Sequence, residues 1–187
     1  KAAQDADRRL VTQLHPDTQA ARGLPESMRE VAKERTRERI ATFLDSTEAS
    51  TLVFSAEGLS YLRHPAELDR LAAFFPDEAV RVTVYLRDKR EFLRSYRRQL
   101  AAMGIAPSDH KDSFAYAADD SWLLDYGRFA GIFGARFGQE NLRTFDYDAE
   151  LRLHGSIVRH FVEDVLAMKA PDAAVDSYWA NVTAARD

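Results

Sequence analysis

With 187 residues and a hydrophobic content of 45%, the chain can bury the core of one compact domain, and we expect a single domain over residues 1–187. The net charge of −4 gives no electrostatic reason to bind nucleic acid or an anionic membrane, and the lack of cysteine excludes disulfides and thiolate metal sites. Because the sequence has no apolar run of about 18 residues and no signal-peptide pattern, we expect a cytoplasmic protein without a membrane span.

The first predicted helix runs from Pro25, a residue that suits a first helical turn, to about Asp45. Its expected apolar stripe consists of Met28, Val31, Ile40, Phe43 and Leu44. Its charged middle, residues 33–39, is expected on the surface. A strand is predicted at residues 51–54, followed by short helices through residues 59–75 and a turn at Pro76 and Asp77.

The segment VTVYLRDKREFLRSYRRQ, residues 82–99, predicts a buried strand followed by a basic helix. Asp88, with Glu91 three residues later, predicts the helix N-cap and places Arg87 at the carboxyl end of the strand. Ligands of open α/β sheets bind outside such strand ends, and the first N–H groups and dipole of the following helix favour an anion. The simpler interpretation is a solvated helix face, formed by Arg87, Arg90, Arg94, Arg97 and Arg98.

The C-terminal half begins with an irregular loop at residues 103–113, the best candidate for a mobile segment. Ser121 is expected to cap the next helix, and Gly138 to end it. The aromatic residues of this helix recur at helical spacing, which predicts core packing; they are Trp122, Tyr126, Phe129 and Phe133. A short strand at residues 142–145 and one amphipathic helix over residues 151–168 follow.

The histidines give no pattern typical of a metal site, and none is expected. His64 could approach the cleft and His110 lies in the irregular loop, but a surface position is the simpler interpretation of both. We expect His154 and His160, on the last helix, to pack or to face solvent. His15 and Asp17 are too sparse a set to bind a metal ion.

Three segments in order resemble bacterial, carbohydrate-type sulfotransferases. The hydrophobic strand with Arg87-Asp88, and Ser95 eight residues after Arg87, is similar to the family's 3′-phosphate-binding segment, although Lys89 stands where members usually have proline. TLVFSAEGLSYL, residues 51–62, resembles the preceding strand and turn, and DYGRFAGIFGARFGQENLRTFDYDAEL, residues 125–151, resembles a helix, turn and strand that follow. The resemblance covers roughly residues 50–165. It implies a three-layer, P-loop-like α/β fold with a short, mainly parallel sheet flanked by helices.

The family's 5′-phosphosulfate loop, a lysine- and glycine-rich turn after the first strand, does not occur in the opening segment of the sequence. Two explanations stay open. The given chain starts downstream of that loop, which its polar, alanine-rich start without methionine favours, or the protein is a degenerate member that does not hold the sulfate.

The resemblance implies a transferase that moves a sulfuryl group from 3′-phosphoadenosine 5′-phosphosulfate to a hydroxyl or amine of a glycan or small metabolite, without a metal. Arg87 and Ser95 would bind the 3′-phosphate. Glu57 is the candidate base, because it closes the predicted strand beside the one that carries Arg87; a structural carboxylate, for example paired with Arg63, is the alternative. Ser55 could contact nucleotide or acceptor.

Two other functions remain open. One is a sulfotransferase-like domain that binds a nucleotide or a protein partner without transfer, and the other is a phosphoryl-transfer enzyme on a related fold. The identity of the acceptor and the oligomeric state do not follow from the sequence.

Overall fold

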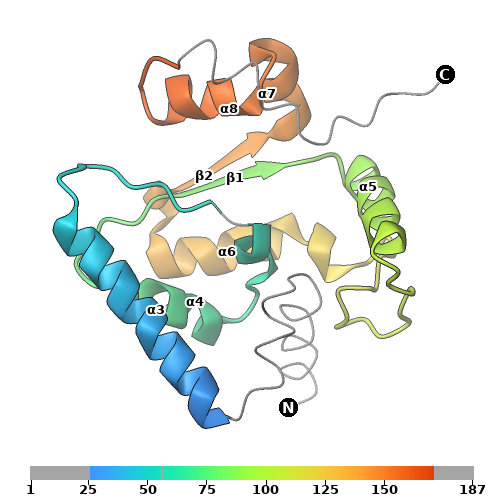
Figure 1. Ribbon diagram of the computed structural model, residues 1–187. Helices are drawn as coiled ribbons and strands as arrows, with labels where there is room; N and C mark the ends of the chain where they lie inside the picture. The colour runs from blue at the N-terminus through green and yellow to red at the C-terminus, as the bar shows by residue number, and fades with distance from the viewer. Residues whose placement is uncertain (1–25, 56, 171–187) are drawn as a thin grey trace. The chain divides into compact units, whose positions relative to one another are not determined.

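The computed structural model describes residues 26–55 and 57–170 and has an α/β architecture (Figure 1). Its helices are α3 (Glu26–Ser46), α4 (Pro65–Ala72), α5 (Lys89–Ala102), α6 (Tyr126–Phe137), α7 (Tyr147–His154) and α8 (Ile157–His160). Short 3₁₀ turns occur at η1 (Glu57–Tyr61), η2 (Trp122–Leu124) and η3 (Gln139–Asn141), and a π-helical turn, η4, spans Phe161–Val165. The predicted α/β class is confirmed.

The sheet consists of two short parallel strands, β1 (Val82–Leu86) and β2 (Leu142–Asp146), drawn as neighbouring arrows in Figure 1. Both strands were predicted, but β1, which was expected to be buried, is half-buried at every residue. The strand predicted at residues 51–54 is wrong, because this segment pairs with no strand among the described residues. Val53 and Phe54 are about half exposed, at 52% and 48%, and Phe54 packs on the ring of Phe75 instead. A β-branched and aromatic run therefore does not make a strand without a partner to pair with.

The described residues form two compact units. The first contains residues 26–55, 57–82 and Leu93–Leu142, and the second contains Thr83–Phe92 and residues 143–170. The core of the first unit is aliphatic and aromatic. Leu68 of α4 is fully buried there. The other buried apolar residues of this unit are Tyr61, Ala72, Leu93, Tyr96, Leu100, Phe114, Ala115, Leu124 and Phe133.

The first helix, α3, has nearly the predicted bounds, whereas Pro25 lies outside the described residues. Its predicted apolar stripe is not buried: Met28, Val31 and Phe43 are each more than half exposed. Within the charged middle of the helix, residues 34–39 are exposed, as predicted. Amphipathic spacing thus identified the helix, but it did not identify a buried face.

Local caps define the ends of α6. Ser121 accepts a hydrogen bond from the amide of Leu123, so it caps the 3₁₀ turn η2 rather than the α-helix. Asp125 caps α6 itself, through the amide of Arg128 at 3.0 Å. Gly138 ends the helix at a φ of 95°, as predicted. Of the predicted aromatic stripe only Phe133 is fully buried, and its ring stacks on Phe129.

The second unit has an aromatic core that contains a histidine. The rings of Tyr85 and Phe145, one from each strand, stack with centroids 5.5 Å apart. The imidazole of His160 packs edge-on against both, at 5.6 Å and 4.7 Å. His160 is only 3% exposed, so its polar nitrogens need partners inside the unit.

The single helix predicted over residues 151–168 is wrong. The chain forms α7, a turn, α8 and η4, because Gly155 takes a left-handed conformation at a φ of 71° and ends α7. Ser156 then caps α8 through the amide of Arg159. This turn reverses the chain and brings α8 next to α7 (Figure 1). In the described part of the chain, no helix combines the length and the apolarity that crossing a membrane requires.

Candidate functional site

Arg87 lies in the second unit, immediately after β1, as predicted. It is half-buried, and its guanidinium lies 5.0 Å from the ring centroid of Tyr147, the first residue of α7. This cation–π contact joins the residue that follows β1 to the residue that follows β2. The two strands are parallel neighbours, so their carboxyl ends form one edge, and Arg87 follows the end of β1 there.

Asp88 is the predicted cap of α5. Its Oδ1 accepts hydrogen bonds from the amides of Arg90 (3.0 Å) and Glu91 (3.1 Å). The amide of Asp88 itself donates to Oδ2 of Asp148 at 3.4 Å. The N–H groups that were expected to favour an anion are therefore partly used by the protein's own carboxylates. Anion binding at this turn would depend on the Arg87 cation more than on the helix terminus.

Ser95 lies on α5 with its side chain exposed, whereas Leu93 and Tyr96 of the same helix are buried. Ser95 belongs to the first unit and Arg87 to the second. One of the helix arginines has a structural contact. Arg97 donates from Nε to the carbonyl of Ala117 at 2.7 Å, so it ties α5 to the loop that precedes α6.

Glu57 begins η1, and its side chain is not among those described. The reason for choosing it as the base does not hold, because residues 26–55 contain no strand and the neighbour of β1 is β2. The carboxylate that does follow the neighbouring strand is Asp148. The sequence contained a signal for it, since the second predicted strand ends two residues before the pair Tyr147-Asp148.

A second set of polar side chains lies around His160 in the same unit. Nδ1 of His160 is 2.7 Å from the hydroxyl of Tyr85, and its Nε2 is 3.5 Å from Oε2 of Glu150. His154 lies between two carboxylates, with Nε2 3.4 Å from Glu150 and Nδ1 3.4 Å from Asp164. Burial, with the negative charges of Glu150 and then Asp164, raises the pKa of Tyr85 to about 12. The hydroxyl therefore stays protonated at neutral pH.

Sequence reasoning missed this cluster, which we name the α7–α8 cluster: Glu150, His154 and His160. Glu150 and His154 are four residues apart, a spacing that places both on one face of a helix. The predicted helix began at residue 151, so Glu150 fell outside it and the pairing was not recognised. His160 joins them only through the turn at Gly155.

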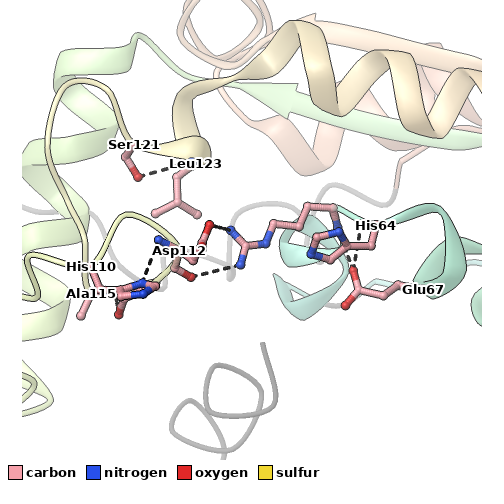
Figure 2. Close-up of polar contacts among 9 residues, drawn as sticks. His64, Glu67, His110, Asp112, Ala115, Ser121 and Leu123 are labelled. Carbon is pink, nitrogen blue, oxygen red and sulfur yellow. Dashed lines mark hydrogen bonds and ion pairs between the residues drawn. The ribbon is translucent and has the colours of Figure 1, made fainter. Parts of the chain in front are cut away.

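The remaining histidines of the described chain belong to a polar network in the first unit (Figure 2). Glu67 accepts hydrogen bonds from the amides of Arg63 (2.9 Å) and His64 (3.1 Å) at the start of α4. Arg63 is buried, and it donates to the carbonyl of Asp112 at 3.1 Å. Nδ1 of His110 accepts from the amide of Asp112 in the same loop. These contacts anchor the irregular loop to the first turn of α4.

Comparisons with protein-family models, with curated proteins and with solved structures each found no match. The residues around β1 and β2, together with the sequence resemblance, are therefore the basis for a functional proposal.

Proposed function

We propose that the protein is a sulfotransferase that uses 3′-phosphoadenosine 5′-phosphosulfate and delivers the sulfuryl group to a hydroxyl or amine of a glycan or small metabolite. The observation that carries the proposal is the placement of Arg87 at the carboxyl end of β1, at the start of a 14-residue basic helix. This is where α/β proteins bind anionic ligands. The finer fold, a three-layer P-loop-like domain, belongs to the same proposal.

Arg87 and Ser95 would hold the 3′-phosphate. A guanidinium offers a planar pair of donors that fits two phosphate oxygens. The contact with the Tyr147 ring already restricts the Arg87 side chain, so binding costs less conformational entropy. Ser95 would add one hydroxyl hydrogen bond from an exposed position on α5. The exposed side chains of Arg90, Arg94 and Arg98 would add long-range attraction for a multiply charged nucleotide.

Transfer requires that the acceptor oxygen or nitrogen attacks sulfur while the bond from sulfur to the 5′-phosphate oxygen breaks. The acceptor proton passes to a base, and adenosine 3′,5′-bisphosphate leaves. Glu57 stays a prediction for this base on sequence order alone. The residues around Arg87 would bind and orient the leaving nucleotide, which is the step that the proposal assigns to them.

Residues 51–54, predicted as a strand before Glu57, do not form one. This favours a second candidate, a nucleotide-binding or interaction domain without transfer. The transferase and a nucleotide-binding domain would share the same nucleotide site. A domain that binds only a protein would have no such site. Transfer of labelled sulfate to an acceptor would separate the first from the second.

The test of the site is calorimetric titration of adenosine 3′,5′-bisphosphate into matched variants. Arg87→Ala should cost about 2–4 kcal/mol, roughly a 30- to 1,000-fold loss of affinity, because it removes a bidentate charge-assisted contact. Arg87→Lys keeps the charge but not the fork and should recover only part of this loss. Ser95→Ala should cost about 1 kcal/mol.

Arg98→Ala is the matched control, since it removes one exposed positive charge from α5, the helix that follows Arg87. It should weaken binding far less than Arg87→Ala. Equal losses in both variants would mean that the helix attracts the nucleotide only through net charge, and unchanged affinity in folded Arg87→Ala would overturn the assignment.

A further inference from the structure

We propose that the α7–α8 cluster, Glu150, His154 and His160, is a binding site for one divalent transition-metal ion, with Zn²⁺ as the best-suited ion. The site is separate from the residues that hold the nucleotide in the proposed function. All three side chains belong to the second unit, and their ligand atoms lie within 4.8 Å of one another. Imidazole and carboxylate are ligands that zinc accepts in proteins.

The backbone places these ligands by local structure. One turn of α7 puts Glu150 and His154 on the same face. Gly155 then ends the helix in a left-handed conformation, Ser156 caps α8, and the reversed chain places α8 next to α7 (Figure 1). His160 of α8 thereby lies against His154. The rings of His154 and His160 have centroids 4.8 Å apart. Glu150 and His154 on α7 and His160 after the turn thus bring their ligand atoms together.

The distances fit a shared ion better than direct hydrogen bonds. Oε2 of Glu150 is 3.4 Å from Nε2 of His154 and 3.5 Å from Nε2 of His160. A charge-assisted hydrogen bond would measure about 2.7–2.9 Å. Bonds of about 2.0–2.1 Å in a tetrahedron separate neighbouring ligand atoms by about 3.3–3.4 Å. An octahedron with bonds of about 2.1 Å would need about 3.0 Å, so the two distances from Glu150 agree more closely with the tetrahedral spacing. The third pair, the ligand atoms of the two histidines, lies within 4.8 Å.

Each imidazole also has a partner on its other nitrogen. The hydroxyl of Tyr85 lies 2.7 Å from Nδ1 of His160, and Oδ2 of Asp164 lies 3.4 Å from Nδ1 of His154. The Tyr85 hydroxyl, at hydrogen-bond distance, orients the His160 ring so that Nε2 faces the site, whereas Asp164 at 3.4 Å acts on His154 as a neighbouring negative charge. The carboxylate of Asp164 would also make His154 a more basic ligand.

Burial leaves one side of the site accessible. The side chain of His160 is 4% exposed, whereas those of His154 and Glu150 are 21% and 22% exposed. An ion can therefore enter beside α7 without opening the aromatic core. Three protein ligands leave a fourth tetrahedral position for water or a small anion, the ligand count typical of reactive rather than purely structural zinc sites.

The test titrates the full chain with Co²⁺, followed by visible absorption, and then with Zn²⁺ by calorimetry. One equivalent of Co²⁺ should give the intense bands of tetrahedral coordination, and Zn²⁺ should displace it. Glu150→Gln and His154→Gln should each weaken Zn²⁺ binding more than about 100-fold, beyond the about 10- to 100-fold expected for the outer variant Asp164→Asn. His110→Asn removes a histidine of the first unit and should change nothing.

Absence of one-equivalent binding, or binding that survives both Glu150→Gln and His154→Gln, would overturn the proposal. Equal weakening by His110→Asn would do the same, since it would show non-specific histidine binding. Circular dichroism checks the fold of each variant. Asp164 is half exposed, so Asp164→Asn should fold even if Glu150→Gln or His154→Gln does not. An unchanged Zn²⁺ affinity of Asp164→Asn would contradict the role of Asp164 beside His154.

Discussion

The hydrogen bond between Tyr85 and His160 should contribute measurably to the stability of the second unit. The two groups are 2.7 Å apart, and His160 is 3% exposed. Tyr85→Phe keeps the ring that stacks on Phe145 but removes the hydroxyl, so Nδ1 of a buried imidazole loses its partner. An unsatisfied buried polar group costs about 1–3 kcal/mol, and we expect the free energy of unfolding to fall by that amount at pH 7.

Urea unfolding of the wild type and the variant measures this difference. Tyr116→Phe is the matched control, because its hydroxyl bonds to Asp120 at 2.5 Å on the exposed surface. That change should stay within about 0.5 kcal/mol. A loss at Tyr85→Phe no larger than the control would refute the argument that His160 depends on this hydroxyl.

The same variant has a predicted pH signature. The pKa of Tyr85 is raised from 10.0 to about 12, chiefly by burial. Between these values the unfolded chain ionises this tyrosine while the folded chain keeps it protonated, so the stabilising contribution is complete below pH 10 and is lost as the pH rises. Wild-type stability should therefore fall more steeply over this window than that of Tyr85→Phe. Parallel curves would contradict the raised pKa.

Three further predictions concern single residues. Gly155→Ala should lower the free energy of unfolding by about 1–2 kcal/mol, because Gly155 has a φ of 71°; unchanged thermal unfolding would contradict a left-handed turn there. Arg63→Ala should lower the free energy of unfolding by about 1.5–3 kcal/mol and speed proteolysis within residues 103–113, since Arg63 is buried and bonds to that loop. An unchanged cleavage rate would argue against the contact of Arg63 with the loop. Lys111 and Tyr116 donate hydrogen bonds that lower the pKa of Asp120, so carboxyl NMR should find it below the usual value, and Tyr116→Phe should raise it; an unshifted pKa would contradict these bonds.

Local signals in the sequence predicted most of the regular structure. The β-branched and aromatic run at residues 82–86, the cap at Asp88 and the glycine at Gly138 each determine structure through neighbouring residues, and the strand, the cap and the helix end are confirmed. The strand at residues 51–54 was wrong because strand formation depends on a partner elsewhere in the chain.

The candidate sites depend on longer-range placement. Arg87 was predictable because a strand end and a helix start are adjacent in sequence. Asp148 required the knowledge that β2 pairs with β1, which no local pattern contains. The α7–α8 cluster required the turn at Gly155, a glycine that the prediction placed inside a continuous helix. Treating that glycine as a helix C-cap would have separated α7 from α8 in advance.

The central claim is that the turn after β1 recognises a 3′-phosphate through Arg87. Calorimetric titration of the wild-type protein with adenosine 3′,5′-bisphosphate and with 5′-AMP tests it most directly, because the two ligands differ in that phosphate alone. We expect the bisphosphate to bind at least about 30- to 1,000-fold more tightly, the equivalent of the bidentate Arg87 contact of about 2–4 kcal/mol. Equal affinity for the two nucleotides, or no binding of either, would contradict the claim.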